Sequence, residues 1–137
     1  MINIFTEDIE FELSEAGKTT EWIEGVIERH GFELAELNYI FCSDEYLHKI
    51  NVEYLDHDTY TDIITFDNSE EEGVIESDVF VSVERIRENA SKFGKTFENE
   101  LRRVIIHGVL HLLGFKDKSP EEAENMRKKE DEALAAY

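Results

Sequence analysis

The order of the sequence patterns predicts an α+β fold. Short segments with the alternation or β-branched composition of strands are grouped in the first two thirds, and helical patterns fill the last third. The chain has 137 residues, the size of one compact domain, and 41% of them are hydrophobic, which is enough for a core. We therefore expect residues 1–137 to form a single α+β domain.

The N-terminal region predicts two short strands and a helix. Residues 2–5 and 9–13 show the short alternation of apolar and polar residues that is typical of strands. Thr19 or Thr20 is placed to cap the helix that follows, because a hydroxyl can accept a free N–H of the first turn. Gly31 is expected to end this helix.

The middle region predicts a strand, a helix and a hairpin. Residues 34–42 alternate as a strand, and a serine and two acids open a helix over residues 43–54. Residues 61–66 are β-branched, residues 74–82 read as a further strand, and the acidic turn at 68–73 separates the two. Two strands joined by a short polar turn indicate a β-hairpin.

The last third predicts three helices. Ser82, Thr96 and Ser119 each precede a helical pattern and have the short hydroxyl side chain of an N-cap. The first two patterns cover residues 83–93 and 97–113, and each is followed by a glycine. The last begins with a proline and two glutamates, which suit the first turn of a helix.

Composition and charge exclude several classes of protein. The single cysteine, Cys42, excludes an intramolecular disulfide and a cysteine zinc site, and we expect it in the core. No apolar run approaches the roughly 20 residues of a membrane span. The first residues lack the basic start of a signal peptide, so the mature protein is expected to begin at Met1. We expect a cytoplasmic protein with no membrane partner.

The charge is uneven along the chain. Lys and Arg total 14 against 33 Asp and Glu, and the net charge of −19 repels nucleic acid on average. Residues 82–118 nevertheless carry a net charge of +3, so the rest of the chain carries −22. This segment is either the place where a phosphate backbone binds or an ordinary solvated helix surface with mixed charges.

A histidine pair lies in the most apolar helical segment, residues 104–113. His107 and His111 are four residues apart, so both imidazoles lie on one side of the helix and suit a metal of the zinc type. Gly114 lets the chain leave the helix, and Asp117 can return as an oxygen ligand. Two nitrogens and one oxygen would leave one coordination position open.

Two unrelated histidines are the ordinary alternative at this spacing. Burial argues against that alternative, because two buried imidazoles without partners are costly. The pattern by itself leaves both interpretations open. Zinc peptidases of the His-Glu-x-x-His type have a glutamate after the first histidine, and Gly108 stands at that position, so peptidase chemistry by that route is not expected.

Four segments resemble one protein family. Residues His107–Gly114 resemble the signature of the YbeY family, bacterial metal-dependent endoribonucleases that mature ribosomal RNA. Asn51–Tyr54, Thr61–Phe66 and Ser77–Ser82 are similar, in the same order, to the family's Asn-x-x-Tyr-Arg, Thr-Asp-Val-Leu-Ser-Phe and Gly-Asp-Ile-x-Ile-Ser segments. The resemblance implies a small mixed sheet with about five helices, one zinc ion held by the buried helix and the loop after it, and action on RNA.

The chain departs from the family pattern at two positions. The third family ligand is a histidine, and Asp117 stands there, which adds a negative charge to the site. The family arginine after Tyr54, thought to engage RNA phosphate, is Leu55 here. A neighbouring cation such as His57 or Arg103 would have to replace it.

Further site residues are expected around the metal. The resemblance implies that Asp78 orients a ligand histidine, although a solvated acid at a strand edge would look the same. Three polar residues alternate with apolar ones, namely Thr61, Asp62 and Thr65. They can line the floor of a cleft, or they can lie on the solvent-exposed face of a hairpin. The candidates for catalysis beside a metal-bound water are His57, Thr65 and Arg103.

The function predicted from the sequence is that of a zinc-dependent, single-strand-acting endoribonuclease working on ribosomal RNA or a ribosomal subunit. Two alternatives stay open. One is a non-catalytic ribosome-assembly factor with structural zinc, and the other is a metal hydrolase acting on a different substrate. A fourth protein ligand would favour structural zinc, and a cleft at the open position would favour an enzyme.

Overall fold

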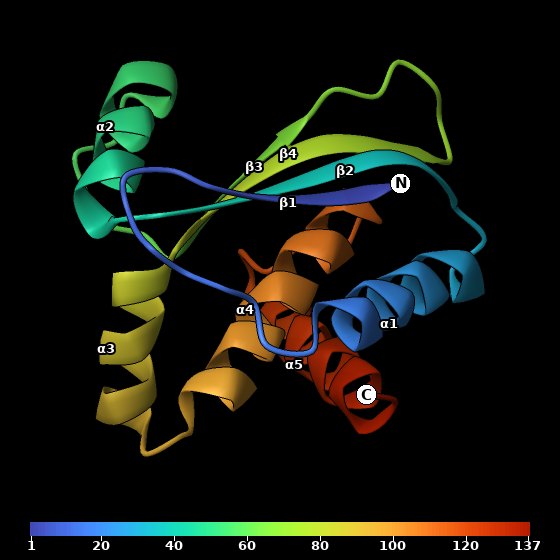
Figure 1. Ribbon diagram of the computed structural model, residues 1–137. Helices are drawn as coiled ribbons and strands as arrows, with labels where there is room; N and C mark the ends of the chain where they lie inside the picture. The colour runs from blue at the N-terminus through green and yellow to red at the C-terminus, as the bar shows by residue number, and fades with distance from the viewer.

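The computed structural model describes residues 1–137 as a four-stranded sheet and five helices. Figure 1 shows α1, α4 and α5 gathered on one side of the sheet, with α2 and α3 toward one end of the strands. The elements are β1 (Ile2–Thr6), α1 (Ala16–Arg29), β2 (Glu33–Cys42), α2 (Asp44–Leu55), β3 (Ile63–Asp67), β4 (Val74–Ser82), α3 (Val83–Phe93), α4 (Phe97–Leu112) and α5 (Pro120–Ala135). No helix has both the length and the apolar character needed to cross a membrane.

The sheet is mixed, as predicted. Its strand order is β1-β2-β4-β3. β1 pairs with β2 in parallel, β2 pairs with β4 in parallel, and β3 runs antiparallel to β4. The α+β class, the number of helices and the β3–β4 hairpin are therefore confirmed. The order leaves β1 and β3 as the two edge strands.

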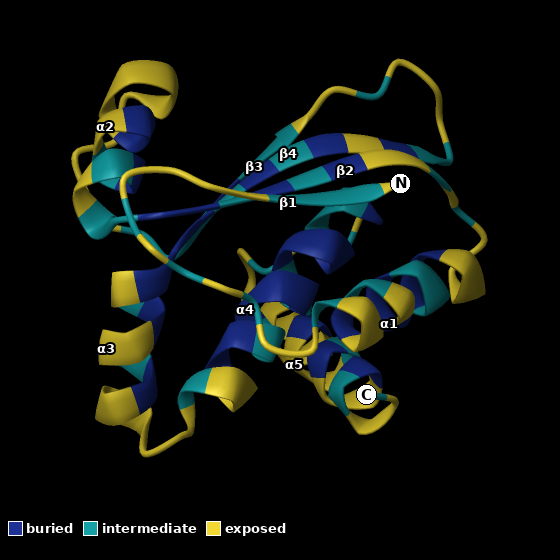
Figure 2. Ribbon diagram, in the orientation of Figure 1, coloured by how far each residue is buried: buried dark blue, intermediate teal, exposed yellow.

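The main core lies between the sheet and the helices below it. Leu37, Tyr39 and Phe41 of β2 face this core and meet the buried side chains of α4. Figure 2 shows α4 buried along most of its length. A smaller cluster on the other side of the sheet joins Cys42 to Leu47 of α2, which confirms that Cys42 is a core residue.

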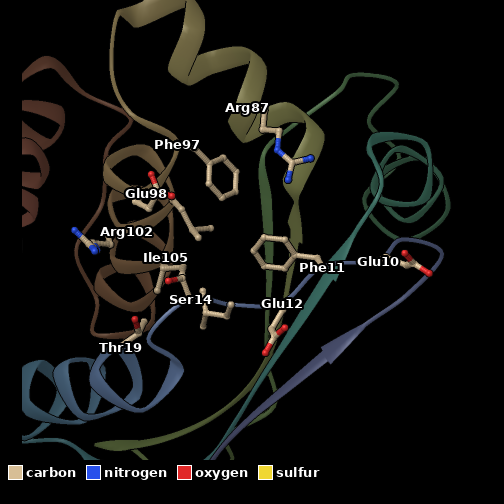
Figure 3. A pocket seen from close by; sticks show the side chains of 12 residues that line it. Glu10, Phe11, Glu12, Ser14, Thr19, Arg87, Phe97, Glu98, Arg102 and Ile105 are labelled. Carbon is tan, nitrogen blue, oxygen red and sulfur yellow. The ribbon is translucent and has the colours of Figure 1, made fainter.

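The expected strand over residues 9–13 is not formed. Because β1 is parallel to β2, the chain after β1 must cross back along the core before the next strand begins. The apolar residues of this connection cover the end of the core, and the Phe11 ring lies 4.9 Å from the ring of Phe41. Figure 3 shows Phe11 and Phe97 beside a pocket of about 320 Å³ that the connection closes against α3 and α4. The alternation therefore reflects packing and not sheet pairing.

Helix capping was predicted correctly at four starts and incorrectly at one. Ser43, Ser82, Thr96 and Ser119 each accept the N–H of the residue three positions later. α1 instead begins at Ala16, and Thr19 is buried within it, with its hydroxyl 3.1 Å from the hydroxyl of Tyr137. A tertiary partner far along the chain explains a threonine that looked like a local cap.

Candidate metal centre

The helix that carries the two histidines is pressed directly against β3. A Cβ atom at Gly108 would lie 2.7 Å from Cδ1 of Ile63 and 3.3 Å from Cγ2 of Thr65. A larger residue here would require the terminal methyl of Ile63 to move and Thr65 to give way slightly, so glycine lets α4 lie close to β3. This contact also sets His107, one residue earlier, beside the edge strand.

The structure brings together the three residues that the spacing singled out. The Nε2 atoms of His107 and His111 are 3.0 Å apart. The Oδ2 atom of Asp117 lies 3.3 Å from Nε2 of His107 and 3.4 Å from Nε2 of His111. Gly114 makes this possible, because its φ of 101° turns the chain back after α4. One nitrogen from each ring and one carboxylate oxygen therefore converge on a single point.

The donor set fits a divalent metal. The Nδ1 atom of His107 lies 2.7 Å from a carboxylate oxygen of Glu130, and Nδ1 of His111 lies 3.0 Å from the carbonyl oxygen of Phe115. Both partners are acceptors, so each Nδ1 carries the N–H, and a neutral ring then has only a lone pair on Nε2. Two such lone pairs and the Asp117 carboxylate repel one another unless a proton or a metal cation lies between them. Three nitrogen and oxygen donors match catalytic zinc sites.

A buried carboxylate behind the site was missed by the sequence analysis. Glu130 of α5 is only 4% exposed and accepts hydrogen bonds from His107 Nδ1 at 2.7 Å and from Arg103 Nη1 at 2.8 Å. Burial by itself would raise the pKa of Glu130, but these two partners outweigh it and lower the pKa. The signal was present in the sequence: Glu130 lies between Met126 and Ala133, at spacings of four and three, on the buried side of α5.

Two predicted residues have other partners. Asp78 lies on the opposite side of the sheet and accepts hydrogen bonds from the side chains of Asn38 at 3.0 Å and Asn68 at 3.2 Å. Its position there follows from the strand alternation, so the expectation that Asp78 orients a ligand histidine is wrong, and Glu130 makes that contact. Arg103 is bound to Glu130 and, at 2.8 Å, to Asp131, so both of its terminal nitrogens already donate to carboxylates.

A cleft of about 390 Å³ opens beside the histidines. Its lining residues come from α2, the loop after α2, β3 and α4, and none of them is lysine or arginine. Burial raises the pKa of Asp62 in this cleft, although the neighbouring His107 opposes the shift. The lining residues are Asn51, Leu55, His57, Thr59, Thr61, Asp62, Ile63, Ile64, Thr65, His107, Gly108 and His111.

The cleft contains two of the three catalytic candidates. His57 and Thr65 line it with the histidine pair, and Leu55 lines it at the position of the family arginine. Thr61 and Asp62 line it as well, as the alternation along the strand suggested. The sequence therefore located the cleft. Of the two side chains expected to replace the arginine, His57 lines the cleft and Arg103 does not.

A helix-borne histidine pair, a loop carboxylate and an adjoining cleft define the class of metal-dependent hydrolases. The sequence matches the family described as "Endoribonuclease YbeY" over residues 2–137. The chain belongs to this family, and the resemblance seen in its motifs is confirmed.

Individual relatives agree with the family assignment. The Endoribonuclease YbeY of Flavobacterium johnsoniae is 53% identical over 137 residues, covering 100% of this chain and 97% of that protein. The Endoribonuclease YbeY of Cytophaga hutchinsonii is 48% identical over 134 residues, covering 98% of this chain and 94% of that protein. A solution structure from Thermotoga maritima superimposes with a TM-score of 0.67 at 30% identity, covering 99% of this chain and 91% of that one.

Proposed function

We propose that this protein is a zinc-dependent endoribonuclease that cuts single-stranded regions of ribosomal RNA, alone or within a ribosomal subunit, in the cytoplasm. Residues 1–137 act as one catalytic domain. The observation that carries the proposal is the convergence of His107, His111 and Asp117 beside an open cleft, in a chain that belongs to an endoribonuclease family.

The residues have separate roles. His107, His111 and Asp117 hold one zinc ion, which supplies Lewis acidity toward a phosphodiester when bound. Glu130 holds the ring of His107 with its Nε2 atom toward the ion, and Arg103 holds Glu130. His57 and Thr65 face the same cleft and are the side chains placed to contact the RNA.

One experiment tests the proposal. The purified protein is analysed for metal, and cleavage of ribosomal RNA fragments is measured before chelation, after chelation and after zinc is restored. We expect one zinc per chain and cleavage that disappears and returns with the metal. A rate that survives exhaustive chelation would overturn the proposal, as would stoichiometric zinc retained after His111→Ala.

A ribosome-assembly factor with structural zinc is the second candidate. The absence of lysine and arginine from the cleft lining favours it, because an RNA-cutting site usually offers a cation to phosphate. Three protein donors instead of four favour the enzyme. Zinc-loaded protein that binds ribosomal subunits and never cleaves RNA would decide for this candidate.

A further inference from the structure

The open edge of β3 borders the metal cleft, and its backbone groups can be assigned. The N–H of Ser82 donates to the C=O of Asp62 at 2.9 Å, and the N–H of Asn68 donates to the C=O of Glu76 at 2.8 Å. Bonded and non-bonded pairs alternate in an antiparallel ladder. The even-numbered residues of β3 therefore bond to β4, and the odd-numbered residues turn their N–H and C=O groups to the free edge.

Two of these outward residues, Ile63 and Thr65, line the cleft. The C=O of Ile63 accepts a hydrogen bond from the hydroxyl of Thr61 at 3.4 Å. The N–H groups of Ile63 and Thr65 point away from β4 and have no hydrogen-bond acceptor. The two N–H groups repeat about every 6.6 Å along the strand. Both side chains face Gly108 of α4, so this edge is fixed against the helix that carries the metal ligands.

The cleft has no permanent positive side chain to hold an RNA strand. Leu55 occupies the place of the family arginine, and Arg103 is bound to two carboxylates. Lys116 and Lys118 flank Asp117 and are exposed, but neither lines the cleft. The other donors that line the cleft are His57, the Asn51 amide, threonine hydroxyls and the strand-edge N–H groups. Arg103 and Arg127 line a separate adjoining hollow of about 240 Å³ that shares Asp62, Ile63 and His107 with the cleft.

We propose that the free edge of β3 positions the substrate: the N–H groups of Ile63 and Thr65 donate to acceptors of a single RNA strand laid along the edge. This inference rests on the proposed endoribonuclease function. It replaces a side-chain cation with neutral donors, and neutral donors displace no counterions. RNA binding should therefore depend only weakly on salt, with a slope of log affinity against log salt shallower than about −1.4, the value for roughly two neutralised phosphates on a single strand.

The first test removes one donor without touching the ladder. Proline is tolerated on edge strands, and Thr65→Pro deletes an N–H that β4 does not use. Thr65→Val keeps the N–H and loses only the hydroxyl. Binding of a short 2′-O-methyl oligoribonucleotide to zinc-loaded protein should be about tenfold weaker in Thr65→Pro than in Thr65→Val, because only the proline variant lacks the N–H while both lack the hydroxyl. Equal affinity of a folded, zinc-loaded Thr65→Pro variant and the wild type would overturn the inference.

The second test restores the missing cation and does not depend on a proline being accommodated. Leu55→Arg should steepen the salt slope by about 0.7, the value for one added phosphate contact on a single strand. A wild-type slope steeper than about −1.4 would overturn the inference, because cations would then hold the RNA. Wild-type protein that neither binds nor cuts RNA when loaded with zinc would overturn the proposed function itself. If the wild type cuts RNA and Thr65→Pro binds RNA equally well, only the role of the β3 edge is disproved.

Discussion

Two hollows of similar size flank α4 and differ in the kinds of side chain that line them. The cleft beside His107 measures about 390 Å³, and the pocket behind Phe97 measures about 320 Å³. At the cleft, donor atoms of the lining residues His107 and His111 converge with a carboxylate oxygen of the neighbouring Asp117. In the pocket, aromatic rings meet, and the charged groups Glu12, Arg87 and Glu98 are exposed and do not converge (Figure 3). Size does not distinguish the two hollows, whereas convergence of donors does.

The largest expected difference between the hollows is in metal binding. His111→Ala removes one of three donors and should abolish zinc binding and, with it, RNA cleavage. His30→Ala is the matched control, because His30 lies outside both hollows, hydrogen-bonds to the carbonyl oxygen of Val26 and packs edge-on against the ring of Phe115. Elemental analysis and a cleavage assay check both variants. Loss of zinc in the control as well would show that the metal is bound elsewhere.

A smaller effect is expected from the carboxylate behind the cleft. Glu130→Ala leaves Nδ1 of His107 without its acceptor, so the ring loses its preferred tautomer, and zinc affinity should fall about 10- to 100-fold. Glu132 is exposed and two residues away, so Glu132→Ala should bind zinc like the wild type. Competition with a chelating dye gives the affinities, and long-range ¹⁵N NMR of the imidazoles reports the tautomer. An unchanged tautomer would contradict the assigned role.

A substitution in the pocket beside Phe97 should change the stability of the protein but not its activity. Phe97→Ala removes a ring that contacts Phe11 and packs on the main core, and unfolding should become easier by about 2 kcal/mol. Zinc content and the cleavage rate per folded molecule should not change. Urea unfolding and the cleavage assay measure the two quantities separately. A selective loss of activity would mean that the pocket takes part in the reaction.

In the metal-free protein, the free energy of unfolding should depend on pH through His107 and Glu130. Burial by itself would lower the pKa of His107, but the bond to Glu130 outweighs it, so the pKa is raised from 6.5. That stabilisation is complete below 6.5 and is lost as pH rises through the raised value. Glu130, whose pKa is lowered from 4.5, contributes above 4.5, and its contribution is lost as pH falls through the lowered value.

Melting temperatures measured across pH test this dependence. His107→Gln should flatten the loss on the alkaline side, because the titrating group is gone. Saturating zinc should also remove that loss, since the metal takes the place of the proton. If the melting temperature falls equally at alkaline pH in the wild type, in His107→Gln and in the zinc-saturated protein, groups other than His107 cause the fall.

The smallest effect is expected at Cys42. Burial, with help from nearby Asp8 and Glu7, raises the pKa of its thiol to about 12. The thiolate is therefore rare at neutral pH, and the native protein should resist alkylation until it is unfolded. Cys42→Ser should change the cleavage rate by less than a few fold. Rapid labelling of the native protein, followed by mass spectrometry, would disprove the burial argument.

Sequence reasoning succeeded where the signal is local. The histidine pair is set by helical periodicity, and Asp117 follows it by six residues, so spacing alone could bring the three together. The N-caps at Ser82 and Ser119 depend on contacts within one turn, and they were predicted for the same reason.

Sequence reasoning failed where the partner lies far along the chain. The contact between Glu130 and His107 spans 23 residues and exists only once α5 docks on α4. The role expected of Asp78 came from the resemblance, and the sequence could not test it, because strand alternation fixes two faces but does not say which one meets α4. The connection over residues 9–13 has a strand's alternation, but it crosses the core without a neighbouring strand to pair with.

The position of Glu130 in chain order has a consequence for synthesis. His107, His111 and Asp117 are all translated before Glu130, and domains are built from the N-terminal end as the ribosome elongates the chain. A nascent polypeptide therefore holds every metal donor before it holds the carboxylate that sets the orientation of His107. The centre matures only when α5 has been made and has folded back onto α4. An unfinished chain still attached to a ribosome, and so surrounded by RNA, carries an incomplete site.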